Sequence, residues 1–401
     1  MTDDPFTLAE LLTPIDKDEF LATSWERRPL VVARGRPDYY AGVLTLDDVD
    51  QLLFTRELHY PAVRLAKVGA SFSPSSFTEN VAWGSRTFDG VIRADTLLAE
   101  YRAGATIIVD ALHRTWKPLT LLCRSLEAEL NHPTQVNIYL TPANAQGFGQ
   151  HYDTHDAFIL QIFGQKHWRI YDAPLQLPLG SQPYDSSKHP TGELIAEVTL
   201  APGDLIYIPR GYVHEATTSD GPSLHVTLGI LAYTWMDVFS EALLRCREDP
   251  RFRMSLPPGF GAADDAAAMA DQFETLARRL AEIAPLEDLL AQLDERFVGS
   301  RRPLLEGQIA TADRLADLSE GSVVRRPPYL IFRLRADEDG VTLLFHGKTL
   351  TFPAFVEPAL RYIADTPELT VSSLPDELTD ESKLVLVRRL VREGFLWRSN
   401  P

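Results

Sequence analysis

The first 232 residues alternate short apolar runs with glycine and proline, a pattern typical of β-strands separated by turns. Helical pieces are expected among these strands, including TLAELL and the amphipathic LTLLCRSLEAELNH. The pattern predicts a mainly β domain with α additions over residues 1–232, a barrel or a sandwich. The strand-like runs, rich in aromatic and β-branched residues, are PLVVARG, ATIIVDA, VNIYLTP, AFILQIFGQKHWRIYDAP, GDLIYIPRGYVHEATT and SLHVTLGILAY.

At residue 233 the apolar spacing becomes helical, and it stays so to residue 312. TWMDVFSEALLRCRED and DQFETLARRLAEIAPLEDLLAQLDERFV both repeat apolar residues at three and four positions. The alanine-rich stretch between them, SLPPGFGAADDAAAMA, is expected to be a loose connection. The broad apolar stripe of these helices packs either on the first domain or on a second copy of the chain. We expect a helical dimerisation unit and a homodimer.

Residues 313–401 return to β-like runs and then to helices. YLIFRLR and VTLLFHGKTLTF precede a helix in FVEPALRYIAD and a second helix that ends before Phe395. This order resembles a winged helix-turn-helix. From Ser322 onward, 11 Lys and Arg residues balance 11 Asp and Glu residues. A DNA-reading winged helix presents a basic face, so we expect this unit to be structural or protein-binding.

The net charge and the cysteine content indicate the kind of partner and the compartment of the protein. The 401 residues carry a formal net charge of −17, which favours a basic partner and makes nucleic acid an unlikely one. Two cysteines without a CxxC pair fit a reducing cytoplasm. The acidic N-terminus does not look like a secretory signal, and no apolar run approaches the roughly 18 residues of a membrane span. A cytoplasmic location is expected.

The stretch GQHYDTHD places candidate metal ligands just before AFILQIF. On a strand, His151 and Asp153 would point the same way, about 6.6 Å apart at roughly 3.3 Å per residue. With one more ligand they would form the two-histidine, one-carboxylate triad of non-haem iron oxygenases. The best candidate for that ligand is His214, after the turn signals of GDLIYIPRGY. Asp156 is out of phase with the pair, and His155 lies too far along unless the strand bulges.

Three further polar residues could face the same metal. In KHWRIY, Lys166 alternates onto one face with Trp168 and Ile170, so it points inward if they do. A buried ammonium needs an anionic partner, which a cosubstrate carboxylate would supply; the alternative is that Lys166 leaves the turn into solvent. Asn137 and Tyr139 share a face of VNIYLTP and could donate hydrogen bonds to that carboxylate.

Together these motifs resemble the ribosomal oxygenase branch of the JmjC/cupin-4 family, the Fe(II)- and 2-oxoglutarate-dependent protein hydroxylases. The resemblance rests on VNIYLTPANAQGFGQHYDTHDAFILQIFGQKHWRIY with GDLIYIPRGYVHEATT and SLHVTLGI. It implies a double-stranded β-helix (JmjC/cupin) catalytic domain at 1–232, a helical dimerisation domain at 233–312 and a winged-helix-like domain at 313–401.

The resemblance also implies roles for single residues. His151, Asp153 and His214 match the iron ligands, and Lys166 matches the basic partner of 2-oxoglutarate. The other matches are Asn137, Tyr139 and Thr227 around the cosubstrate, and His155 and His225 toward the substrate.

The implied reaction is hydroxylation of a histidine or arginine side chain of a ribosomal protein at the β-carbon. The acidic charge of the chain fits such a basic partner. The family often has an acidic and then an apolar residue after the H-x-D pair, where this chain has Thr154 and His155. Substrate choice therefore stays open. The alternatives are the same chemistry on a biosynthetic peptide or small molecule, and a non-enzymatic cupin that binds or regulates.

Overall fold

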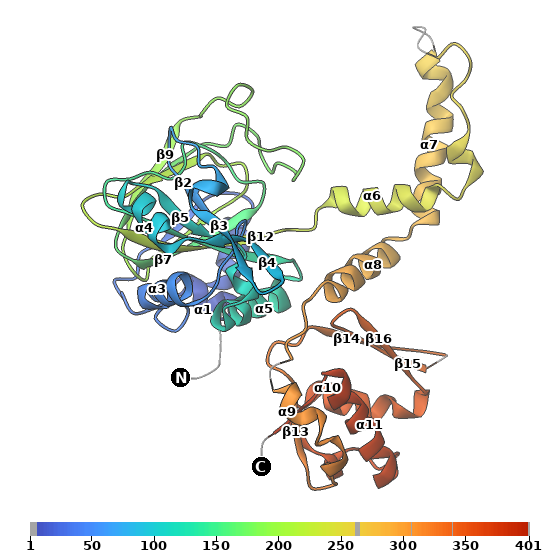
Figure 1. The fold of residues 1–401 in the computed structure, drawn as a ribbon. Coiled ribbons are helices and arrows are strands. Elements are labelled where there is room, and N and C mark those ends of the chain that lie inside the picture. The colour runs from blue at the N-terminus through green and yellow to red at the C-terminus, as the bar shows by residue number, and fades with distance from the viewer. Residues whose placement is uncertain (1–5, 261–264, 306, 339, 400–401) are drawn as a thin grey trace. The chain divides into compact units, whose positions relative to one another are not determined.

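The structure, a computed structural model, describes residues 6–260, 265–305, 307–338 and 340–399 (Figure 1). The chain divides into two compact units, residues 1–232 and residues 233–401. The predicted further division of the second unit at residue 312 stays a prediction.

Two helices of the first unit begin with side-chain capping motifs. Thr7 and Glu10 form a capping box at the start of the first helix, and Thr45 and Asp48 form another at the third. The fifth helix ends at Leu130 and is capped by Asn131, which has the left-handed conformation that terminates helices. The helices are α1 (Leu8–Leu12), α2 (Lys17–Thr23), α3 (Leu46–Thr55), α4 (Ala94–Arg102) and α5 (Lys117–Leu130).

Two antiparallel sheets make up the barrel of the first unit, as the strand pattern predicts. The larger has the order β1 (Leu30–Val32), β10 (Leu205–Ile208), β7 (Asp156–Phe163), β12 (Ser223–Ile230), β6 (Thr134–Thr141), β5 (Thr106–Val109), β2 (Val63–Ala66). The smaller has the order β11 (His214–Thr217), β8 (Lys166–Tyr171), β9 (Leu194–Leu200). A separate two-stranded sheet is formed by the hairpin of β3 (Thr78–Trp83) and β4 (Arg86–Ile92), and Val91 of β4 forms an isolated antiparallel bridge with His59.

Alternation along the central strands separates a core from a polar interior. On β12, Leu224, Val226 and Leu228 are buried in the main hydrophobic cluster with residues of β6 and α5. His225 and Thr227 point to the opposite face, since successive side chains alternate. There the larger sheet faces the smaller one across a second buried cluster, which consists of Ile159, Trp168, Ile170, Leu200, Ile206 and Ile208.

The second unit contains helices and two small sheets. Its helices are α6 (Trp235–Cys246), α7 (Asp265–Ile283), α8 (Leu286–Gly299), α9 (Gln308–Ala312), α10 (Glu357–Asp365) and α11 (Asp380–Glu393). One sheet has the order β14 (Phe332–Asp337), β15 (Gly340–Phe345), β16 (Lys348–Phe352), and the other β17 (Glu368–Thr370), β13 (Val323–Arg325), β18 (Trp397–Arg398). The interpretation of this region as a winged helix stays a prediction.

Two local expectations for the second unit are wrong. α7 already begins at Asp265, so the end of the alanine-rich stretch is helical and not loose, because alanine has the highest helix propensity. Residues 261–264 of that stretch lie outside the described residues. The run VTLLFHGKTLTF forms two strands and not one, since His346 and Gly347 adopt positive φ angles of 50° and 71° and turn the chain.

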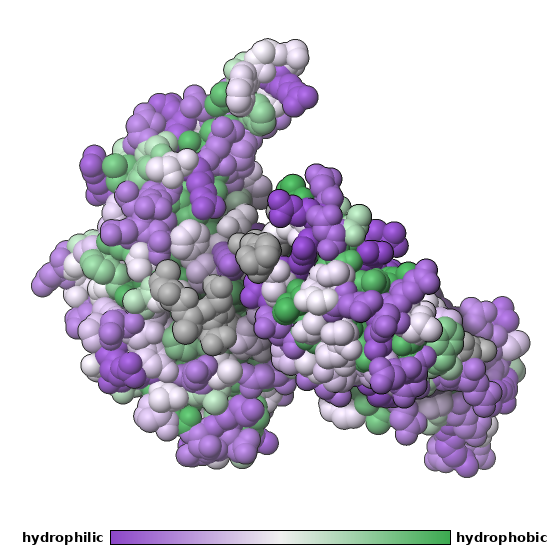
Figure 2. Space-filling view, turned by 90° about the horizontal axis from the view of Figure 1, so that it is seen from below, coloured by the Kyte–Doolittle hydropathy of each residue, from purple (hydrophilic) through white to green (hydrophobic). Residues whose placement is uncertain are grey.

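The surface combines a mostly hydrophilic cover with a local apolar exposure. Hydrophilic side chains predominate over the face drawn in Figure 2, which agrees with the formal net charge of −17. α6 nevertheless exposes about half or more of the side chains of Trp235, Met236, Phe239 and Leu243. Among the described residues, no helix combines the length and apolarity needed to cross a bilayer.

Candidate metal centre

His151, Asp153 and His214 converge in the interior of the first unit. His151 forms an isolated antiparallel bridge with His214, in which the His151 N–H donates to the His214 carbonyl at 3.2 Å and the reverse bond is 2.8 Å. The expectation that His151 and Asp153 share a strand is wrong, because β7 begins only at Asp156. The segment is held by single backbone contacts instead, including a bond from the Gly211 N–H to the Asp153 carbonyl at 3.1 Å.

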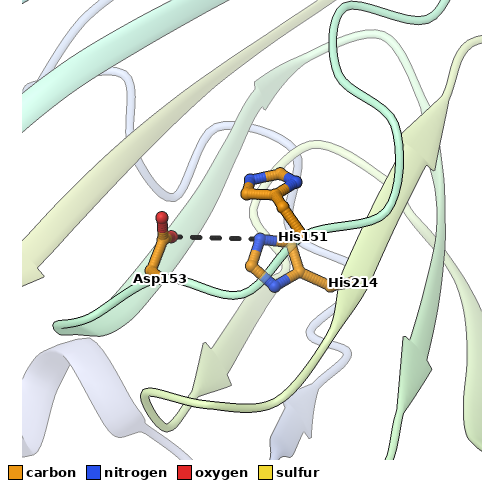
Figure 3. A group of neighbouring side chains, drawn as sticks. All are labelled: His151, Asp153 and His214. Carbon is orange, nitrogen blue, oxygen red and sulfur yellow. Dashed lines mark ion pairs between the residues drawn. The ribbon is translucent and has the colours of Figure 1, made fainter. Parts of the chain in front are cut away.

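The three side chains point toward one another (Figure 3). One ligand atom from each lies within 4.8 Å of the others, and Nε2 of His214 is 3.9 Å from Oδ2 of Asp153. Nδ1 of His151 faces the Gly149 carbonyl at 2.8 Å and Nδ1 of His214 faces the Tyr212 carbonyl at 3.1 Å. Since a carbonyl only accepts, each Nδ1 carries the hydrogen and each Nε2 lone pair is left for a metal. This donor set fits a divalent transition metal with open coordination positions.

The protonation states of the ligands also suit a cation. Burial, and then the charge of His151, lower the pKa of His214 to about 4, so its imidazole is neutral at pH 7. Burial opposes ionisation of Asp153, but the imidazoles of His155, His214 and His151 outweigh it and lower the pKa of that carboxyl. Metal ligands must be deprotonated, and the lowered pKa values of His214 and Asp153 favour that state for both.

A cavity of about 260 Å³ adjoins the three ligands. Of the residues that the sequence singled out, Tyr139, Lys166, His225 and Thr227 line it. Residues that the sequence reasoning missed line it as well. They are Arg64, Thr106, Gly147, Phe148, Ile159, Glu215 and Ala216. Trp168, which the alternation of KHWRIY places on the inward face, also lines the cavity, whereas Arg64 on β2 has no local signal.

Lys166 is the buried cation of this cavity. It is 5% exposed, and its Nζ donates to Oγ1 of Thr141 at 3.0 Å. Burial lowers its pKa to about 7. No carboxylate in the described part of the chain forms an ion pair with it. A buried ammonium without a counter-ion fits the carboxylate of a bound acid.

The side wall of the cavity combines Tyr139 and His225. Their rings stack at 4.8 Å between centroids with an angle of 5° between planes. Burial lowers the pKa of His225 well below its usual value, and its Nδ1 has no hydrogen-bond partner among the residues that the structure describes. Asn137 does not belong to the lining described above. Its Oδ1 accepts a hydrogen bond from the Ala111 N–H at 2.9 Å, so Asn137 stabilises the chain beside the cavity wall.

Asp156 lies apart from the three candidate ligands, which form the cluster without it. It is fully buried and pairs with Arg210, whose Nη1 is 2.7 Å from Oδ2 of Asp156. Arg210 also donates its backbone N–H to Oδ1 of Asp156 at 3.2 Å, and its Nη1 reaches Glu26 at 2.5 Å. The next residue, Gly211, binds the Asp153 carbonyl. The network therefore connects the two chain segments that carry the candidate ligands.

The comparisons with known proteins agree with this architecture. A model of the JmjC domain matches residues 113–238. Ribosomal oxygenase 1 of Gallus gallus is 28% identical over 98% of this chain and 71% of its own length. The bifunctional lysine-specific demethylase and histidyl-hydroxylase NO66 of Drosophila persimilis is 28% identical over 98% of this chain and 63% of its own. Human ribosomal oxygenase 1 is 31% identical over 73% of this chain and 47% of its own.

Among solved structures, the Escherichia coli ribosomal oxygenase YcfD has the same fold. The TM-score is 0.54 at 20% identity, with 96% of this chain and 98% of that chain covered. A structure of YcfD with cobalt and 2-oxoglutarate gives a TM-score of 0.55 at 21% identity, with 96% and 99% covered. This chain therefore contains a JmjC domain, and its relatives are named as an oxygenase and as a demethylase and histidyl-hydroxylase. Its similarity to the ribosomal oxygenases and NO66 proteins extends over 98% of the chain.

Proposed function

We propose that this protein is a 2-oxoglutarate-dependent dioxygenase that hydroxylates the β-carbon of a histidine or arginine side chain in a ribosomal protein. The observation that supports it most directly is the convergence of His151, Asp153 and His214 beside a cavity with one buried, unpaired ammonium. A metal triad and a carboxylate partner in one cavity are what this chemistry requires. The names of the relatives supply the substrate class.

His151, Asp153 and His214 would hold Fe(II) through two Nε2 atoms and one carboxylate oxygen. Bound iron and 2-oxoglutarate supply the oxidising chemistry, and the protein supplies position. The backbone carbonyls of Gly149 and Tyr212 fix the tautomers and ring planes of the two histidines. Three protein ligands leave open positions on the metal.

Lys166 would bind the distal carboxylate of 2-oxoglutarate. Its ammonium lies at the buried end of the cavity, held by Thr141, which also accepts from Oγ1 of Thr106 at 3.1 Å. Tyr139 and Thr227 line the same cavity and each offers a hydroxyl to the cosubstrate. The buried rings of Trp168 and His225 exclude water around it.

Several features support a basic protein substrate and an assembled enzyme. The net charge of −17 attracts a basic ribosomal protein. The exposed apolar side chains of α6 support a homodimer through residues 233–312. The chain has two cysteines, Cys123 and Cys246, both buried and without a CxxC pair, which supports a location in the reducing cytoplasm. The balanced charge from Ser322 onward favours a protein-binding or structural role there over nucleic-acid binding.

Succinate formation tests the proposal. Purified protein with Fe(II), ascorbate, 2-oxoglutarate and ribosomal protein should release succinate, and His151→Ala and Asp153→Ala should abolish it, because each removes a ligand. His167→Ala is the matched control, since His167 lies on the outer face of β8 and contacts Glu197. Equal succinate formation by wild type and both ligand variants would overturn the metal assignment.

A further inference from the structure

Gly229 occupies an unusual position in the interior of β12. It pairs with Gln135 of β6 and Ala157 of β7, in the middle of the larger sheet. Glycine weakens a strand interior, and there it often marks a place where another group approaches closely. At Gly229 that group is His155. A Cβ added to Gly229 would lie 2.3 Å from Cδ2 and 2.6 Å from Nε2 of the His155 ring.

The ring of His155 thus lies on the cavity side of the sheet. His225, Thr227 and Gly229 alternate onto one face of β12, and His225 and Thr227 line the cavity. Gly229 is the next position of that row. Gln135 flanks the same position, because its Cγ would be 3.3 Å from the added Cβ. The imidazole of His155 and the carboxamide of Gln135 therefore lie at Gly229, one position beyond the residues of β12 that line the cavity.

Both side chains keep hydrogen-bonding capacity for a ligand. His155 and Gln135 are both partly exposed. Within the described ranges, neither forms a side-chain hydrogen bond or an ion pair. An imidazole and a carboxamide each offer a donor and an acceptor without a fixed charge. A polypeptide presents the complementary set, one N–H and one C=O for each residue.

We propose that His155 and Gln135 bind the main chain of a polypeptide substrate next to the residue that enters the cavity. Gly229 makes this possible, because only a residue without Cβ leaves room for the His155 ring against the sheet. The inference rests on the proposed function, and it assigns the substrate to polypeptides and not to free small molecules. His155 thereby positions the peptide while His151, Asp153 and His214 hold the metal.

The test compares His155→Ala and Gly229→Ala with wild type. The first removes the hydrogen-bonding ring, and the second displaces it while keeping the histidine. Gly221→Ala is the matched control, because Gly221 precedes the same strand and nothing lies within 4 Å of its added Cβ. The probe is total ribosomal protein from cells that lack this gene, and the readout is the substrate-concentration dependence of the gain of one oxygen atom by mass spectrometry.

Both variants should raise the KM for the protein substrate by about tenfold, the effect of losing roughly one hydrogen bond. The KM for 2-oxoglutarate in the same reactions should change less than twofold, and Gly221→Ala should match wild type. Variants with a wild-type KM for the protein substrate would overturn the inference alone. A wild type that releases no succinate would instead overturn the proposed function, and the inference with it.

Discussion

Replacing Lys166 by methionine should stabilise the protein while it abolishes cosubstrate binding. The ammonium of Lys166 is 5% exposed and its hydrogen-bond partner, Thr141, is neutral. A charge in such a place costs free energy that only a bound carboxylate offsets. Methionine has a similar volume and no charge, so the cost disappears when the cosubstrate is absent.

The size of the expected gain in stability follows from the lowered pKa of Lys166. Burial lowers the pKa of Lys166 from 10.5 to about 7. At about 1.4 kcal/mol for each tenfold change in the acidity constant, this corresponds to about 5 kcal/mol as an upper value. Unfolded chain binds more protons than folded chain between pH 7 and pH 10.5, so wild-type stability rises with pH in that window. The advantage of Lys166→Met is therefore largest below pH 7 and fades toward pH 10.5.

Urea unfolding of both proteins with metal and 2-oxoglutarate removed measures this difference. The signal is tryptophan fluorescence, and the pH runs from about 6 to about 10, to span the titration. Lys188→Met is the matched control, because Lys188 is exposed in the same unit and should show no pH-dependent gain. A Lys166→Met protein that is less stable than wild type at pH 6, or equally stable, would refute the reasoning about the buried charge.

Three further changes have expected outcomes. Asp156→Asn removes the charge that faces Arg210, so urea unfolding should show a free energy of unfolding that is lower by about 3 kcal/mol. Titration with Co(II) should show weaker binding. Unchanged Co(II) affinity would contradict the role of this network in connecting the segments that carry the candidate ligands. The KM for 2-oxoglutarate should rise with pH above about 7, because Lys166 of the free enzyme then loses the positive charge that attracts the carboxylate. A KM that stays constant between about pH 6 and about pH 9 in steady-state assays would contradict the binding of the carboxylate by Lys166. Phe239→Glu on the exposed face of α6 should yield monomers by light scattering at micromolar concentration, and a monomeric wild type would contradict the proposed dimer.

Much of the fold follows from local pattern. The alternation in VNIYLTP and KHWRIY predicts which side chains of β6 and β8 face inward, and the structure buries Lys166, Trp168 and Ile170 accordingly. Strand spacing carries this information because a pleated strand alternates its side chains regardless of its neighbours.

The details that local pattern misses depend on tertiary contacts. His151 and Asp153 precede β7 and do not lie within a strand, because His151 forms an isolated bridge with His214 and Asp153 accepts a single bond from the Gly211 N–H. The contribution of Arg64 depends on where β2 pairs in the sheet, which periodicity does not determine. The fit of His155 against Gly229 likewise joins segments more than 70 residues apart.

The central claim is that this enzyme transfers one oxygen atom to a ribosomal protein. Intact-mass spectrometry of ribosomal proteins from cells with and without this gene tests it most directly. The account predicts one protein that is heavier by one oxygen atom in cells that carry the gene, and fragmentation should assign that atom to the β-carbon of a histidine or arginine. Identical masses for every ribosomal protein in the two samples would contradict the claim.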